Sequence, residues 1–268
     1  MRETEAMPET PSISRADYVT SLARGLSVMR LFSADTPRLT VSDAARRSGL
    51  SRAAVRRLLL TLVAEGYAAQ DREAFTLRPR VMELGYAWLS TLGLPELAQP
   101  HLLEVSAAVN ENCSLGILDG DDVLYVARSS ARRIVQSTQM AIGTRLPANV
   151  SSMGRVLLAH LPDSELADSL RRRPPHRFTP VTTVDLRVLR DLLSRVRQQG
   201  FALVEGEFEA GLISVAVPVR NAAGKVVAAI NVGAPTSRAT RAEMLERHLP
   251  AIRAAAREVE RGLALRAA

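Results

Sequence analysis

The chain has 268 residues, a formal net charge of +7 and a single cysteine. This length is enough for two domains with their own apolar cores, and one cysteine excludes an intramolecular disulfide, so we expect a reducing compartment. No stretch approaches the ~20 apolar residues that span a bilayer, and the first residues lack the apolar core of a signal peptide. We therefore expect a cytoplasmic protein without a membrane partner, whose positive charge fits a polyanion.

The N-terminal part is predicted to be a polar tail followed by a helix. Residues 1–17 are polar and contain prolines, and we expect them to be disordered. Residues 18–32 place Val19, Leu22 and Leu26 at helical spacing, which predicts an apolar face. This helix is expected to complete a three-helix unit with the two helices that follow.

Residues 40–66 have the pattern of two amphipathic helices around a Ser-Gly-Leu-Ser turn. Thr40 or Ser42 can cap the first helix, and Gly49 is suited to end it. Ser51 can cap the second helix. That helix repeats apolar residues with the 3.6-residue period of a core-facing stripe, at Val55, Leu58, Leu59, Leu62 and Val63.

The other side of this second helix is basic. Arg52 lies in its first turn, where a recognition helix touches base edges, and Arg56 and Arg57 flank the apolar stripe. The arginine fork matches two acceptors on guanine, Ser51 and the helix N-terminus suit a phosphate, and the small Ala53 permits close approach. The pattern predicts a helix-turn-helix for the major groove of duplex DNA; two ordinary surface helices with solvated arginines are the alternative.

A wing is predicted directly after the helix-turn-helix. Residues 67–77 read as two short strands joined by Asp-Arg-Glu, with Arg72 at the tip, where it can meet a phosphate or the minor groove. From Arg46 to Arg80 there are eight basic residues and three acidic ones. We expect a winged helix-turn-helix domain over residues 18–79, with double-stranded operator DNA as its partner.

A linker helix is predicted over residues 80–93, because Val81, Leu84 and Trp88 are roughly aligned and Gly93 can end the helix. Nothing inside a small winged helix covers such a stripe. This suggests packing against a second subunit, although contact with the chain's own C-terminal domain is an equally ordinary interpretation.

The remaining residues, 94–267, predict an antiparallel sheet flanked by helices, which gives an α+β fold class. Helices are expected at residues 97–112, 163–172, 184–199 and 241–265, with a kink at Pro250 in the last one. Strands are expected at residues 113–118, 122–127, 136–142, 201–207, 211–220 and 225–234. We interpret this part as a sensor-like domain.

Residues 143–159 contain the best candidate for a ligand site. Pro147 ends a strand, Ser151 or Ser152 can cap the next helix, and the N–H groups of Ser152, Met153 and Gly154 would then form an anion site suited to a carboxylate. The alternative is a capped helix packed on the sheet without a ligand.

Motifs of catalysis and metal binding are missing from the sequence. The four histidines are scattered without metal-ligand spacing, and no HExxH, Walker loop, GxGxxG or GxSxG occurs. We therefore expect no catalytic residues, no metal and no cofactor.

Four motifs together resemble the IclR-type transcriptional regulators: SLARGLSVMRLF, LTVSDAARRSGLSRAAVRRLLLTLVAEGY, GTRLPANVSSMGRVLLA and GLISVAVPVRNAAGKVVAAINV. The third motif and the Arg132-Arg133-Ile134 element look most like the subgroup that controls protocatechuate and 4-hydroxybenzoate breakdown through β-ketoadipate. The resemblance implies a GAF-like or profilin-like effector domain, a homodimer or tetramer, and an effector of the protocatechuate, 4-hydroxybenzoate or β-ketoadipate class.

The resemblance also implies pocket residues. These are the backbone amides of Ser152 and Met153 beside Ser151, the apolar wall Leu146, and the polar residues Ser214 and Asn231. Where the family often has an acid, this chain has Val204 with Glu205 next to it, and a usual serine is replaced by Gly233, so the pocket is expected to favour a ring over a glyoxylate-sized acid. Arg133 either neutralises a second carboxylate or lies at the surface.

Three hypotheses about function remain open from the sequence. The first is a one-component regulator, in which an acid metabolite binds the C-terminal domain and alters operator binding by a dimer. The second is an enzyme of small acids with an accessory DNA-like domain. The third is an architectural DNA binder without sequence preference.

Overall fold

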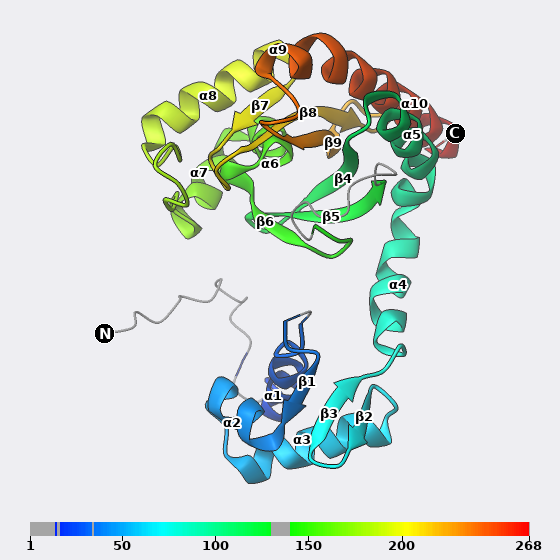
Figure 1. Ribbon diagram of the computed structural model, residues 1–268, viewed down its shortest axis with the longest axis vertical. Helices are drawn as coiled ribbons and strands as arrows, with labels where there is room; N and C mark the ends of the chain where they lie inside the picture. The colour runs from blue at the N-terminus through cyan, green and yellow to red at the C-terminus, as the bar shows by residue number, and fades with distance from the viewer. Residues whose placement is uncertain (1–13, 15–16, 34, 130–139, 268) are drawn as a thin grey trace. The chain divides into compact units, whose positions relative to one another are not determined.

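A computed structural model describes residues 14, 17–33, 35–129 and 140–267. The chain folds as two compact units, Met1–Thr91 and Leu92–Ala268 (Figure 1). None of the helices in the described ranges is both long enough and apolar enough to cross a bilayer.

The N-terminal unit is a small helical domain with a three-stranded sheet. Its elements are α1 (Thr20–Met29), β1 (Arg38–Thr40), α2 (Val41–Ser48), α3 (Arg52–Ala64), β2 (Ala68–Asp71), β3 (Ala74–Leu77) and α4 (Val81–Leu92). Among the described residues the strand order is β1-β3-β2, so the predicted wing hairpin is present and β1, which the sequence did not predict, extends it. Val28, Val55, Leu59 and Phe75 form the core between helices and sheet.

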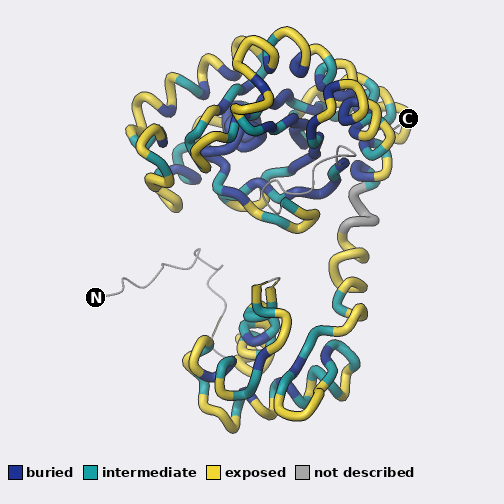
Figure 2. Tube along the Cα trace, viewed as in Figure 1, coloured by how far each residue is buried: buried dark blue, intermediate teal, exposed yellow. Residues whose placement is uncertain are grey.

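Two helices of this unit leave apolar side chains in solvent. On α1 the predicted apolar face is exposed at Leu22 and Leu26, and Val28 is the residue that reaches the core instead. On α4 Met82 and Tyr86 are more than half exposed within this single chain. Figure 2 shows α4 as a largely exposed segment.

The C-terminal unit is built on an antiparallel sheet. Its helices are α5 (Leu94–Val109), η1 (Ala148–Val150), α6 (Ser152–Ala159), α7 (Asp163–Arg172), α8 (Leu186–Gln199), α9 (Arg241–Glu243), η2 (Met244–His248) and α10 (Leu249–Ala267). Its strands are β4 (Asn112–Asp119), β5 (Asp122–Ser129), β6 (Arg145–Pro147), β7 (Ala202–Glu205), β8 (Leu212–Arg220) and β9 (Val226–Pro235). In the described part of the chain they form one sheet of order β6-β5-β4-β9-β8-β7, which confirms the predicted α+β class.

Helices cover the sheet and bury its apolar side chains. Met153 and Val156 of α6 join Leu189 and Leu193 of α8 in a core that contacts Ala216 and other small residues of the strands. α5 packs on β4 and β5, and α10 packs on α5 and on β8. The start of α6 is thereby fixed against the sheet, where a cavity opens.

Three details differ from the prediction. The expected strand at 136–142 lies partly outside the described residues, and its described end, 140–142, is not a strand. The helix predicted from residue 97 already begins at Leu94, because Pro95 is acceptable in a first helical turn. The expected kink at Pro250 takes the form of the π-helical turn η2, which directly precedes Leu249 and Pro250.

Candidate functional site: a nucleic-acid interface and an effector cavity

The helix α3 separates an apolar side from a basic side. Val55 and Leu59 are fully buried, whereas Arg52, Arg56 and Arg57 are exposed. The helix begins because the Ser51 hydroxyl accepts a hydrogen bond from the Ala54 amide at 3.2 Å, which satisfies an N–H group that has no partner inside the helix. The arginine side predicted to read DNA therefore faces solvent and not the protein interior.

The exposed arginines differ in their partners. Arg46 donates to Asp43, and Arg47 donates to the Thr36 hydroxyl. Within the described ranges, the guanidinium groups of Arg52, Arg56 and Arg57 make no ion pair or hydrogen bond, and all three are solvated. They remain available to phosphates or base edges, which is the chemistry that duplex DNA requires.

Thr40 and Ser42 lie at the start of α2, and Arg72 lies at the tip of the wing. The Thr40 hydroxyl accepts from the Asp43 amide at 3.1 Å and donates to its carboxylate at 2.7 Å, so it acts first as a helix cap, while Ser42 is exposed. Arg72 is exposed and has a positive φ of 54°, and its carbonyl accepts from Gln70. Ala53 is exposed on α3 beside Arg52.

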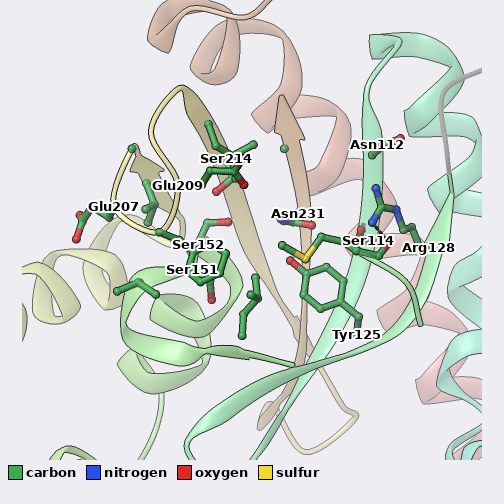
Figure 3. Close-up of a pocket in the computed structure, with 18 residues that line it drawn as sticks. Asn112, Ser114, Tyr125, Arg128, Ser151, Ser152, Glu207, Glu209, Ser214 and Asn231 are labelled. Carbon is green, nitrogen blue, oxygen red and sulfur yellow. Dashed lines mark hydrogen bonds between the residues drawn. The ribbon is translucent and has the colours of Figure 1, made fainter. Parts of the chain in front are cut away.

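A cavity lies in the C-terminal unit between the sheet and the start of α6 (Figure 3). It holds about 680 Å³ of empty space, its opening to solvent included. The polar residues that line it are Asn112, Ser114, Tyr125, Arg128, Ser151, Ser152, Glu207, Glu209, Ser214 and Asn231. The apolar lining comes from Met140, Leu146, Val150, Val204, Phe208 and Leu212, with Gly206 and Gly233.

The register of the sheet explains how residues distant in sequence reach this cavity. Gly233 of β9 pairs with Asn112 of β4 on one side and with Ser214 of β8 on the other. Val204 of β7 in turn pairs with Ser214. Residues directly opposite one another share a face of the sheet, so this row lines the cavity. Asn231, two residues before Gly233, is on the same face.

The start of α6 presents unused hydrogen-bond donors to the cavity. The Ser151 hydroxyl caps the helix by accepting from the Gly154 amide at 3.0 Å, so that N–H group is occupied and not free, contrary to the prediction. The amides of Ser152 and Met153 still lack an intrahelical acceptor, as first-turn amides do. In addition, the Ser152 hydroxyl is buried and has no hydrogen-bond partner among the described residues.

Gly154 is required for the close packing of this helix start. A Cβ atom there would lie 2.1 Å from the carbonyl oxygen of Ala148, an impossible contact with backbone. The glycine thus lets η1 fold back against the first turn of α6. This contact fixes Ser151 and Ser152 at the cavity.

The other predicted effector residues are distributed unevenly. Leu146, Ser214 and Asn231 line the cavity, whereas the Met153 side chain is fully buried in the core beneath α6. Glu205 is exposed and does not line the cavity, because its neighbour Val204 occupies the inward-facing position of β7. Arg133 lies outside the described residues.

Several lining residues were missed from the sequence. Asn112 and Ser114 alternate on a buried strand, and this period of two was the available signal. Tyr125 and Arg128 of β5 had no local signal. Burial raises the pKa of Tyr125 to about 12, so its phenol stays protonated at neutral pH and can donate a hydrogen bond.

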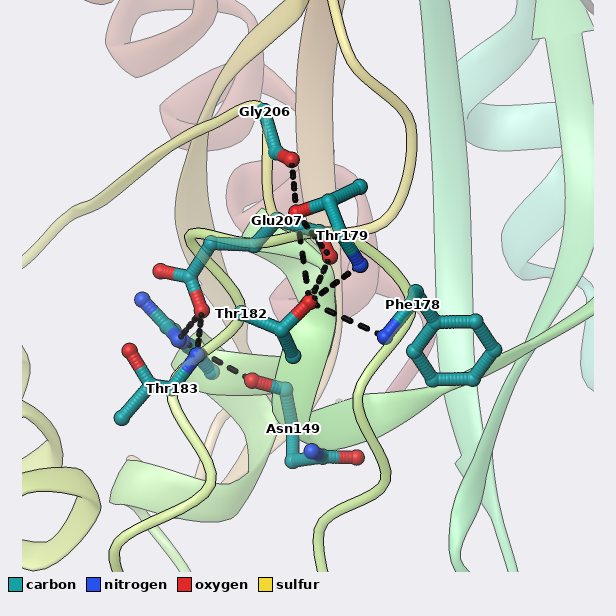
Figure 4. Close-up of polar contacts among 8 residues, drawn as sticks. Asn149, Phe178, Thr179, Thr182, Thr183, Gly206 and Glu207 are labelled. Atoms are coloured by element: carbon teal, nitrogen blue, oxygen red, sulfur yellow. Dashed lines mark hydrogen bonds and ion pairs between the residues drawn. The ribbon is translucent and has the colours of Figure 1, made fainter.

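One wall of the cavity is the β7–β8 loop, residues 206–211, and a second segment holds it in place (Figure 4). In the segment between α7 and α8, Thr179 donates to the Gly206 carbonyl at 2.7 Å and Thr182 to the Glu207 carbonyl at 2.6 Å. The Thr183 amide donates to the Glu207 carboxylate at 2.8 Å.

Arg155 of α6 completes this arrangement. It donates to the Asn149 carbonyl at 2.9 Å and to the Glu207 carboxylate at 2.6 Å. The helix whose start presents Ser152 is thereby joined to the loop that lines the cavity on the same side in Figure 3.

Each of the two units matches a known protein-family domain. The IclR helix-turn-helix domain matches residues 21–72, and the bacterial transcriptional regulator IclR C-terminal domain matches residues 86–261. The Pca regulon regulatory protein of Pseudomonas putida is 42% identical over 243 residues, which are 91% of this chain and 84% of that protein.

Solved structures give the same result. A transcriptional regulator from Rhodococcus sp. RHA1 is similar with a TM-score of 0.83 and 47% identity, over 92% of this chain and 98% of that one. An IclR homologue from Microbacterium hydrocarbonoxydans, crystallised with 4-hydroxybenzoate, has a TM-score of 0.81 and 31% identity, over 93% of this chain and 100% of that one. The resemblance noted from the sequence is confirmed: the chain belongs to the IclR family of bacterial transcriptional regulators.

Proposed function

We propose that this regulator controls genes of aromatic-acid breakdown and that a small aromatic or dicarboxylic acid is its effector. In this proposal residues 18–79 bind operator DNA, residues 80–93 form the linker helix, and residues 94–267 bind the effector and oligomerise. The names of two relatives support the assignment, since one regulates the Pca regulon and another was crystallised with 4-hydroxybenzoate.

The observation that carries the proposal is the buried hydroxyl of Ser152 at the start of α6, for which the described ranges of the chain offer no hydrogen-bond partner. A buried polar group without a partner costs about 1–3 kcal/mol, so a ligand that accepts its hydrogen bond recovers this free energy. The first-turn amides and the helix dipole favour an anion at the same point. A carboxylate meets both requirements.

The revised effector site follows from the lining of the cavity. We assign Ser151, Ser152, Leu146, Ser214 and Asn231 to effector binding, as the sequence predicted. Tyr125, Arg128, Asn112 and Ser114 are added because they line the same cavity. Glu205 is left out because its side chain is exposed on the other face of β7.

A second copy of this chain is the proposed partner of the exposed apolar side chains on α1 and α4. Leu22, Met82 and Tyr86 are each more than 60% exposed, which is unusual for large apolar residues that have no partner. A two-fold dimer presents two α3 helices to half-sites about one helical turn apart, ~34 Å, or a multiple of this spacing. A tetramer would contain two such dimers.

Operator binding with and without effector tests the proposal. The full-length protein first selects an operator from a random duplex pool, and its affinity is then measured by fluorescence anisotropy. Protocatechuate, 4-hydroxybenzoate or β-ketoadipate should change this affinity by about 5- to 150-fold, the usual size of allosteric coupling. By reciprocity, the operator must change the affinity for the acid by the same factor. If none of the three acids alters operator binding, the proposal is wrong.

The same experiment separates the two other hypotheses. A sequence-specific regulator should prefer its operator to random duplex by at least about 10³-fold, whereas an architectural binder should hold both equally. An enzyme should convert the acids, which chromatography of the incubated ligand would detect. Release of unchanged acid argues against an enzyme.

A further inference from the structure

We infer that Arg128 forms a second anion-binding end of the effector cavity and that the effector therefore carries an acidic group at each end. This inference rests on the proposed function, since it concerns the ligand of the same cavity.

Arg128 is a partly buried cation for which the described residues supply no counter-charge. Its guanidinium lines the cavity and donates to the carbonyl of Met140. Among the described residues no carboxylate forms an ion pair with it. The adjoining residues 130–139 contain no aspartate or glutamate. A buried guanidinium without an anion is costly, so its place in a ligand cavity indicates that the ligand supplies the anion.

The lowered pKa of Arg128 agrees with this interpretation. Burial lowers this pKa, whereas the neighbouring Tyr125 acts in the opposite direction and only partly offsets it. An arginine nevertheless keeps its proton at neutral pH. The Arg128 guanidinium therefore stays charged in a place where water solvates it only partly, which costs desolvation free energy. A carboxylate in the cavity would offset this free energy.

The cavity has its other anion-binding end at the start of α6. In Figure 3 Ser152 and Arg128 lie on opposite sides of the cavity, with Tyr125 and Asn231 between them. The free amides and the hydroxyl at Ser152 can hold one carboxylate, and the guanidinium can hold the other in a bidentate manner. A monoacid satisfies one end and leaves the other unpaired.

The acidic residues of the lining do not take the place of the ligand. Glu207 is bound by Arg155 and by the Thr183 amide, so its charge is already compensated. Glu209 is exposed to solvent. In the described part of the chain neither carboxylate forms an ion pair with Arg128.

Two pairs of acids test the inference by isothermal titration of the full-length protein. Adipate is compared with hexanoate, which has the same chain length and one carboxylate, and terephthalate with 4-methylbenzoate, which has the same ring. The wild-type protein should bind at least one diacid roughly tenfold more tightly than its matched monoacid. Arg128→Gln should abolish this preference and change monoacid affinity by less than about threefold, and Arg128→Lys should keep part of it.

Arg145→Gln is the matched control, because Arg145 is on the neighbouring strand β6 and pairs with Asp119 outside the cavity lining. This variant should keep the preference for diacids. The inference about Arg128 is overturned if diacids and monoacids bind the wild type equally, or if Arg128→Gln weakens both alike. If monoacids alone bind and shift operator affinity, the proposed function stands and the inference fails; if no acid binds, both fail.

Discussion

Arg155 and Glu207 form a buried ion pair, with the guanidinium 2.6 Å from the carboxylate and only 4% and 11% of the two side chains exposed. Arg155 belongs to α6, the helix that starts at the cavity, and Glu207 belongs to the β7–β8 loop, which also lines the cavity. The pair is further bonded by the Asn149 carbonyl and the Thr183 amide. The ion pair therefore joins two segments of the cavity lining to each other.

The first prediction concerns the stability contributed by this pair. Glu207→Gln leaves the Arg155 guanidinium buried without a counter-charge, so the free energy of unfolding should fall by about 3–5 kcal/mol in urea denaturation. The double variant Arg155→Met/Glu207→Leu should recover most of this loss, because it removes both charges. Asp168→Asn, which breaks the exposed pair with Arg171, is the control and should cost less than about 1 kcal/mol. If Glu207→Gln and Asp168→Asn lower the free energy of unfolding equally, the buried pair contributes no more to stability than the exposed one.

The second prediction distinguishes Ser152 from its neighbour Ser151. Ser152→Ala removes a buried hydroxyl without a partner in the part of the chain that the structure describes, so stability should stay the same or rise by about 1 kcal/mol, while affinity for the effector acid should fall about tenfold. Ser151→Ala removes the cap of α6 and should cost about 1 kcal/mol of stability. Thermal unfolding and titration with 4-hydroxybenzoate measure the two quantities. A loss of stability in Ser152→Ala without a change in affinity would contradict the assignment.

The fold was predictable where the pattern is local. The apolar period in α3, the cap at Ser51 and the turn at Gly49 all depend on residues within a few positions of one another, and the structure agrees with each of them. The hairpins of the C-terminal sheet were predicted for the same reason, since short turns flanked by apolar runs specify them. β1 was missed because three residues are too few to show a period.

The cavity was only partly predictable because its lining depends on the register between strands. Ser214 and Val204 share a face through pairing of β8 with β7, and no local pattern indicates which of Val204 and Glu205 points inward. Arg128 reaches the cavity from β5, which has β4 between it and β9. From the sequence, Arg133 was the arginine considered for a second carboxylate, and it stays a prediction because it lies outside the described residues.

The third prediction concerns the pH dependence of stability that His160 causes. Burial is the main cause of the lowered pKa of His160, whose ring contacts the Val156 carbonyl at 2.8 Å and Arg220 at 3.1 Å. Because the pKa of His160 is lower in the folded protein, the imidazole of the unfolded chain takes up a proton first as the pH falls below about 6.5. The free energy of unfolding therefore decreases as the pH falls through this range. His160→Gln should therefore lose less stability between pH 7 and pH 5 than the wild type. Parallel stability profiles of the two proteins in urea denaturation would rule out this contribution.

The fourth prediction concerns DNA recognition by the arginines of α3 and of the wing. Arg52→Ala or Arg56→Ala should lower the preference for operator over random duplex by about 1–3 kcal/mol, because each removes an unpaired, exposed fork on the reading side. Arg72→Ala should weaken binding to operator and random duplex similarly, as expected for a phosphate contact. The plot of log binding constant against log salt concentration should become shallower by about one unit, because about one counterion fewer is released. Arg187→Ala, an exposed arginine of α8, is the control and should change neither quantity. Operator preference that survives both α3 substitutions would show that another surface reads the sequence.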